Sequence, residues 1–260
     1  MITSLQSNEI DIAIGLTEGW VAGLGKAQAE SKIAGYKMVG TYVETPLCWA
    51  ISAGANREDV KGVEELKGGK MGVSRIGSGS YVMGFVLADT HKWLSSPSTS
   101  SSSASAPFSI IPLQTFTRLR EAVNDGIADF FMWEHFTSKR YYDNGEIKRI
   151  GEIYTPWPSW HIVARPEVIG DERMEEVLEK VNLGIKYFEE HQEEAVEYIS
   201  TKLDYSAEDA REWMKTVKFA EDVRGVRGSV VQETVTVLKK AGVLGQEVGV
   251  EEMVGIRRKE

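Results

Sequence analysis

The segment that most constrains the fold is a strand, a tight turn and a helix that follow one another between residues 71 and 94. Residues 71–74 predict a short strand, residues 77–80 (Gly-Ser-Gly-Ser) a turn, and residues 81–94 an apolar helix. A helix N-terminus has unpaired N–H groups and a partial positive charge, so this turn can receive an anion or a polar ligand edge. The alternative is that Ser78 or Ser80 only caps the helix. Residues 77–80 are called the serine turn below.

Composition excludes several classes of protein. The chain has 260 residues, enough for one large domain or two lobes. Its net charge of −9 disfavours a nucleic-acid or anionic-membrane partner. The single cysteine, Cys48, excludes an internal disulfide and a cysteine-rich metal site. No segment is typical of a transmembrane helix or a signal peptide, so we expect a cytoplasmic protein with no membrane insertion.

Short strands alternate with helices over the first part of the chain. This order predicts an α/β fold with parallel sheets and right-handed crossovers. From residue 171 onward the pattern is helical, and residues 95–106 are a serine-rich, low-complexity insertion in a surface loop. Strands are expected at 8–14, 36–43, 47–53, 71–74, 108–113, 127–133, 147–154 and 161–164, and helices at 20–31, 81–94, 115–125, 171–203, 206–218 and 229–241.

Carboxylates and tryptophans follow the predicted strands. In open α/β sheets, ligands bind beyond the carboxyl ends of the strands. Glu18 and Glu134 lie in such loops, and indole rings there could stack on a planar or cationic ligand. Any one of these tryptophans taken alone would more often belong to the core. Five of the seven tryptophans lie in or beside these loops: Trp20, Trp49, Trp133, Trp157 and Trp160.

Four segments together resemble a known family. They are ITSLQSNEIDIAIGLTEGWVAGL (2–24), VEELKGGKMGVSRIGSGSYVM (63–83), FTRLREAVNDGIADFFMWE (116–134) and WPSWHIVARPEV (157–168). In this order they are similar to the type II periplasmic-binding-protein-like family, in the branch that binds sulfonates and thiamine-pyrimidine precursors. Within that branch the sequence resembles fungal, intracellular members related to the thiamine-pyrimidine synthases.

The resemblance implies two α/β lobes joined by two hinge strands, with a ligand held between lobes that close on it. Lobe 1 would comprise residues 1–46 and 157–260, and lobe 2 residues 47–156. The positions that match the family's binding segments are Thr17, Glu18, Gly19, Thr45, Pro46, Trp49, Gly77, Ser78, Gly79, Ser80, Tyr81, Trp133, Glu134, Trp157, Trp160 and His161. For His161, a strand residue bonded to backbone is an equally good interpretation.

The sequence departs from the family in two respects. Members normally open with a strand and most of a helix before the position of Met1. We expect that strand between the strands at 8–14 and 36–43, so its absence would leave a gap in the sheet of lobe 1. The related synthases also carry a cysteine-rich iron motif, with a lysine and a histidine that serve as cofactor anchor and substrate. The matching iron motif is absent here, and the histidines have no metal-ligand spacing.

We therefore expect no catalytic residues, metal or cofactor. The expected function is non-catalytic binding of a small organic ligand, either similar to a pyrimidine or thiamine precursor or bearing a sulfonate or phosphate group. One alternative is an enzyme of thiamine-pyrimidine biosynthesis or related metabolism. Another is an interaction module whose cleft no longer binds a ligand. The sequence leaves open whether a transporter is a partner.

Overall fold

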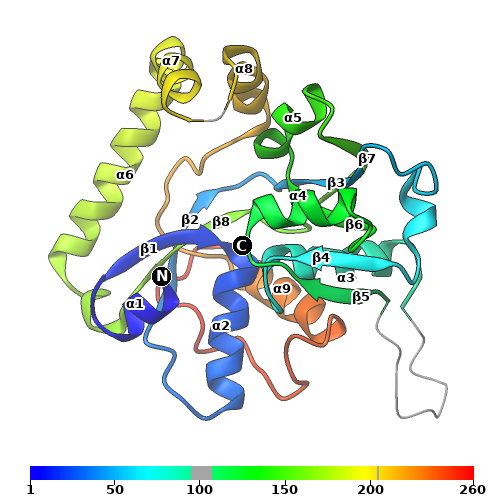
Figure 1. Ribbon diagram of the computed structural model, residues 1–260. Coiled ribbons are helices and arrows are strands. Elements are labelled where there is room, and N and C mark those ends of the chain that lie inside the picture. The colour runs from blue at the N-terminus through cyan, green and yellow to red at the C-terminus, as the bar shows by residue number, and fades with distance from the viewer. Residues whose placement is uncertain (95–106, 204) are drawn as a thin grey trace. The chain divides into compact units, whose positions relative to one another are not determined.

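The computed structural model describes residues 1–94, 107–203 and 205–260 (Figure 1). Its contacts divide the chain into two units, each described here by itself. Unit 1 contains residues 1–47 and 156–260, and unit 2 contains residues 48–155. From the sequence, the predicted boundaries between the lobes lie between residues 46 and 47 and between residues 156 and 157. The predicted insertion at 95–106 lies outside the described residues.

Unit 1 is built on a three-stranded sheet in the order β1 (Ile12–Leu16), β8 (Trp160–Ala164), β2 (Lys37–Val43). β8 is antiparallel to both neighbours, so β1 and β2 run in the same direction. The expectation of a gap between these two strands is wrong, because β8 occupies that position and hydrogen-bonds to both. The strand that returns from unit 2 thus completes the centre of this sheet.

The helices of unit 1 cover this sheet and extend beyond it. Along α6, Met174, Leu178 and Ile185 recur at a helical spacing and pack on Val39 and Ile162 of the sheet. The single helix predicted at 171–203 is divided at His191, whose backbone leaves the helical region. The described helices of this unit are α1 (Ile2–Gln6), α2 (Thr17–Ala29), α6 (Glu172–Glu190), α7 (Gln192–Lys202), α8 (Ala207–Thr216) and α9 (Gly228–Lys240), with a 3₁₀ turn at Pro166–Val168.

Unit 2 has a five-stranded sheet in the order β5 (Ser109–Pro112), β4 (Lys70–Val73), β6 (Phe130–Glu134), β3 (Cys48–Gly54), β7 (Ile147–Tyr154). β4 is parallel to β5 and to β6, as strand–helix–strand connections predict. β3 is antiparallel to β6 and β7. The expectation of purely parallel sheets is therefore wrong for one strand in each unit. These strands, β3 and β8, are the first after the chain enters the unit, and no crossover helix within that unit sets their direction.

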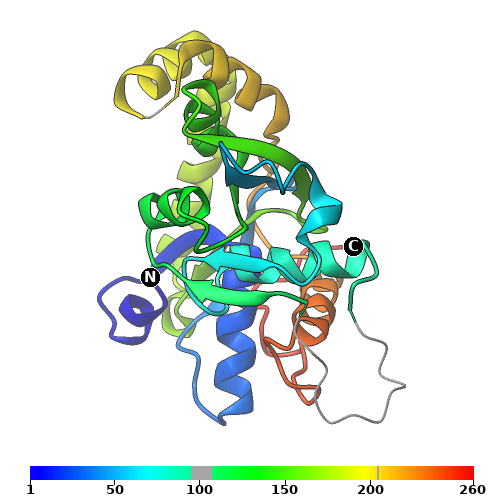
Figure 2. The ribbon, with the colours of Figure 1, turned by 45° about the vertical axis from the view of Figure 1, so that its right-hand side comes forward.

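Helices lie on both faces of the unit 2 sheet (Figures 1 and 2). Adjacent side chains of a strand point to opposite faces. Phe131 therefore packs against Phe116 of α4, whereas Phe130 packs against Phe108 on the other face, where α3 lies. The helices are α3 (Gly79–Thr90), α4 (Phe116–Asn124) and α5 (His135–Asp143), with a 3₁₀ turn at Val63–Leu66. The sequence analysis did not predict α5.

Candidate ligand-binding site

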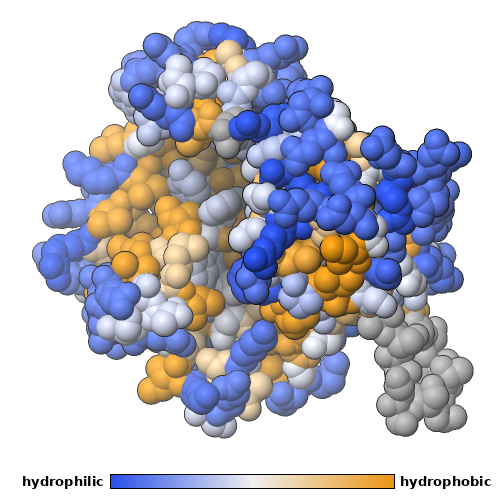
Figure 3. All heavy atoms as spheres, viewed as in Figure 1, coloured by the Kyte–Doolittle hydropathy of each residue, from blue (hydrophilic) through white to orange (hydrophobic). Residues whose placement is uncertain are grey.

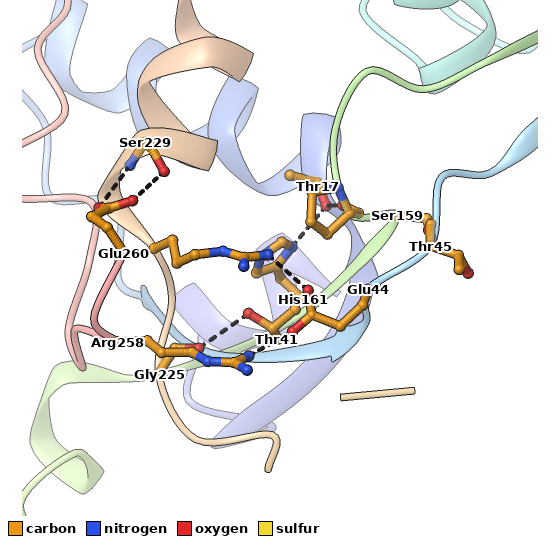
Figure 4. A network of polar contacts seen from close by, with 12 residues as sticks. Thr17, Thr41, Glu44, Thr45, Ser159, His161, Gly225, Ser229, Arg258 and Glu260 are labelled. Atoms are coloured by element: carbon orange, nitrogen blue, oxygen red, sulfur yellow. Dashed lines mark hydrogen bonds and ion pairs between the residues drawn. The ribbon is translucent and has the colours of Figure 1, made fainter. Parts of the chain in front are cut away.

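One edge of the unit 1 sheet gathers three of the predicted binding loops. Leu16 at the end of β1 and Val43 at the end of β2 both pair with Trp160 at the start of β8. Ser159 connects the loops: its N–H and Oγ donate to the carbonyl oxygen of Thr45 at 3.2 and 2.8 Å, and its own carbonyl accepts from the N–H of Thr17 at 3.1 Å. Figure 4 shows Thr17, Thr45, Ser159 and His161 in this network.

His161 has a defined tautomer and an unused acceptor. Thr17 Oγ1 donates its only hydroxyl hydrogen to the carbonyl of Pro158 at 2.5 Å, so it accepts from Nδ1–H of His161 at 2.8 Å. Nε2 then carries a lone pair, is fully buried and has no hydrogen-bond partner among the described residues. Burial, together with the positive charge of Arg227, lowers the pKa of His161 to about 3. The imidazole is therefore neutral near pH 7.

Glu18 is a buried carboxyl group at the start of α2. Its side chain is 1% exposed, and Oε2 accepts from the indole N–H of Trp157 at 3.1 Å. Oε1 is buried without a hydrogen-bond partner in the described parts of the chain. Burial raises the pKa of Glu18 from 4.5 to about 7, although its backbone N–H and Trp157 oppose the shift. Near neutral pH the carboxyl is therefore protonated about half of the time.

Two arginines that the sequence analysis missed lie at the same edge. Arg227, directly before α9, donates to Glu44 Oε2 at 2.8 Å, and Arg258 donates to Glu44 Oε1 at 2.6 Å (Figure 4 shows Glu44 and Arg258). Two guanidinium groups and one carboxylate give this cluster a net positive charge. The arginines follow Glu44 by more than 180 residues, so no local motif connects them with it.

The serine turn of unit 2 caps α3. Gly77 has φ of +77°, a backbone conformation that favours glycine. Ser78 Oγ accepts from the N–H of Tyr81 at 3.3 Å and lies 3.0 Å from Ser80 Oγ; both serines are buried. Capping therefore does occur. The N–H groups of Gly79 and Ser80 still have no intrahelical acceptor, as at every helix N-terminus.

The other predicted residues of unit 2 lie at the same sheet edge as the serine turn, because β4 and β6 are parallel. Glu134 caps α5: Oε1 accepts from the N–H of Phe136 at 2.9 Å, and Oε2 from the N–H and Oγ1 of Thr137, each at 2.6 Å. One face of Trp133 stacks on Phe116, with centroids 4.9 Å apart. The carboxylate of Glu134 is thus already engaged by its own helix.

Three of the predicted tryptophans are buried. Trp20 is 3% exposed and donates to the carbonyl of His161 at 3.2 Å; Trp49, within β3, is also buried. Trp157 is buried as well, with its N–H used to orient Glu18. Trp160 is half-buried and Pro46 is exposed.

Within residues 1–94, 107–203 and 205–260, no three His, Cys, Asp or Glu side chains are grouped so that they could hold a metal ion. No helix in these ranges is long and apolar enough to cross a membrane.

Unit 1 also has an apolar groove of about 370 Å³ beside α6. Figure 3 shows apolar residues gathered on the side where Figure 1 places this helix. The groove contains none of the predicted binding residues, and its lining differs in chemistry from the polar edge described above. It is lined by Ile14, Tyr42, Val181, Gly184, Ile185, Phe188 and Phe219.

Comparisons with known proteins agree with this architecture. The model of the Ca3427-like PBP family matches residues 49–153. Among solved structures, the Candida albicans CA3427 gene product is 41% identical, with a TM-score of 0.83 over 100% of this chain and 84% of the other. It is described as defining a new family with the generic periplasmic binding protein fold.

Two more distant structures share the fold. The aliphatic sulphonate binding protein SsuA of Escherichia coli is 13% identical, with a TM-score of 0.71 over 100% of this chain and 80% of the other. SsuA of Xanthomonas axonopodis pv. citri, bound to MOPS, is 14% identical, with a TM-score of 0.71 over 97% of this chain and 83% of the other. No curated protein sequence matches significantly. The identity to the Candida albicans protein over the whole chain shows that this protein belongs to the CA3427 family, which has the periplasmic-binding-protein fold.

Proposed function

We propose that this protein binds a small organic ligand and releases it chemically unchanged. The observation that carries the proposal is a pair of buried polar atoms, Glu18 Oε1 and His161 Nε2, that lack hydrogen-bond partners in the described residues. An unsatisfied buried polar group costs about 1–3 kcal/mol. Both residues lie at the carboxyl edge of the unit 1 sheet, where α/β proteins bind ligands. A ligand that pairs with these atoms would recover that cost.

The proposed ligand combines a nitrogen heterocycle or amine, similar to a pyrimidine or thiamine precursor, with a sulfonate or phosphate group. Glu18 accepts from the nitrogen, and the N–H groups of Gly79 and Ser80 hold the anion. The sulphonate binding by the Escherichia coli relative and the MOPS bound to the Xanthomonas relative support an anionic group.

Isothermal titration calorimetry tests the proposal. The compounds are MOPS, taurine, 4-amino-5-hydroxymethyl-2-methylpyrimidine, its phosphate, and thiamine. We expect saturable one-to-one binding of at least one of them, with weaker binding to a Glu18→Gln variant. A Glu176→Gln variant is the matched control, because Glu176 is exposed on α6. If a protein with native circular dichroism binds none of the five, the proposal is wrong. Recovery of a converted compound would show an enzyme instead.

A further inference from the structure

We infer that the ligand presents a cationic nitrogen donor to unit 1, and that Glu18 releases a proton to solvent when this ligand binds. The inference rests on the proposed function and specifies the ligand chemistry of the same site.

The unsatisfied atoms of unit 1 call for hydrogen-bond donors. His161 Nε2 is an acceptor because the Nδ1 hydrogen is given to Thr17. Glu18 Oε1 is an acceptor in the ionised carboxylate, whose other oxygen already receives the N–H of Trp157. A sulfonate oxygen, or an oxygen of a fully ionised phosphate, is itself an acceptor and cannot satisfy either atom in this state. An ammonium or a protonated amino-heterocycle supplies N–H donors that can satisfy an acceptor of this kind.

Among the residues that the structure describes, none of the groups that shift the pKa of Glu18 is a cation. Among the described helices and strands, β1, β8 and α9 pack most extensively on α2. β1 carries no titratable side chain, and β8 contributes the neutral His161. At the start of α9, the guanidinium of Arg227 is bound to Glu44. A cationic ligand would therefore supply the positive charge that pairs with Glu18. The electrostatic attraction between opposite charges is stronger in a buried site than in water.

The proton balance follows from burial. In the ligand-free protein, burial raises the pKa of Glu18 to about 7, so the carboxyl retains its proton about half of the time near pH 7. When a cation binds, the O–H bond breaks, the proton passes to the buffer, and the carboxylate accepts the ligand's N–H. About half a proton is thus released per ligand near pH 7 and nearly one near pH 6. An anionic group in the same place would instead retain the proton or take one up.

The test is calorimetry in phosphate and in Tris, whose heats of ionisation differ. Two matched pairs of compounds are titrated: taurine with ethanesulfonate, and 4-amino-5-hydroxymethyl-2-methylpyrimidine with its 4-oxo counterpart. We expect an amino compound to bind at least tenfold more tightly than its partner. Taurine, whose amine is already protonated in solution, should show the stated proton release, whereas the aminopyrimidine should take the Glu18 proton on its ring nitrogen. Glu18→Gln should abolish both effects, and Glu176→Gln should preserve them.

Each outcome decides the inference. If the compounds without the amino group bind as tightly, or if the heat does not depend on the buffer, the inference is overturned while the proposed function stands. If none of the four compounds binds, the inference is overturned. The proposed function falls as well only if MOPS, the pyrimidine phosphate and thiamine also fail to bind. Infrared difference spectra of the ligand-free protein between pH 5.5 and 8.5 give an independent check. They should contain a protonated-carboxyl band that Glu18→Gln lacks, and its absence from the wild type would also overturn the inference.

Discussion

The buried carboxyl of Glu18 should make the stability of the protein depend on pH. Its pKa is about 7 in the folded protein and near 4.5 when exposed to solvent. Because the folded pKa is the higher one, the stabilising contribution is complete below pH 4.5 and is lost as pH rises through 7. The difference of about 2.5 pKa units corresponds to about 3.5 kcal/mol in total, since one unit is worth about 1.4 kcal/mol. Glu18→Gln keeps the size of the side chain and removes the titration.

Urea unfolding at a series of pH values measures this effect. The free energy of unfolding of the wild type, minus that of Glu18→Gln, should fall by about 3 kcal/mol between pH 4.5 and pH 8. Taking the difference cancels the contributions of the other titrating groups. Glu176→Gln, at an exposed position, should show no such trend against the wild type. A difference that is flat with pH would refute the conclusion that Glu18 is buried without a compensating charge.

Three further variants test individual contacts. The pKa of His161 is lowered to about 3 in the folded protein, so the stability that this residue contributes is present above pH 6.5 and is lost as the pH falls below that value. Between pH 6.5 and pH 4.5, the free energy of unfolding of the wild type should therefore fall by about 2 kcal/mol relative to that of His161→Asn in urea unfolding. Trp157→Phe removes the buried donor to Glu18, which should cost about 1–3 kcal/mol in the same assay and raise the pKa of Glu18 further. Ser78→Ala removes the side-chain cap of α3 and should cost about 1 kcal/mol; an unchanged unfolding midpoint would contradict the capping role.

Local patterns predicted most of the fold. The strand, turn and helix predicted around the serine turn are present as β4 and α3. They could be predicted because hydrophobic periodicity and glycines at turns are signals carried by neighbouring residues. The position of β8 at the centre of the unit 1 sheet was not predicted, since strand order depends on contacts more than 100 residues apart. Helix α5 was not predicted because its sequence is polar and its apolar residues show only a weak helical periodicity. Its N-cap is Glu134, which was predicted as a binding residue.

The predicted binding residues are brought together within each unit, but their individual roles differ from the expectation. Glu18 and Glu134 look equivalent in the sequence, each following a buried strand. In the structure Glu134 is occupied by its own helix, whereas Glu18 has an unsatisfied oxygen. The sequence cannot reveal this difference, because the burial of Glu18 depends on residues distant in the chain, such as Trp157, which lies 139 residues away and bonds the other oxygen. The bonds of Arg227 and Arg258 to Glu44 likewise join residues from distant parts of the chain.

Native mass spectrometry of the purified protein tests ligand binding most directly. The account predicts a non-covalent adduct on the 28.9 kDa chain, either carried from the expression host or formed with one of the five compounds. The adduct should disappear on denaturation, return as an unmodified small molecule, and be depleted in Glu18→Gln but not in Glu176→Gln. A folded wild-type protein that shows only the mass of its polypeptide, with and without the compounds, would contradict the account.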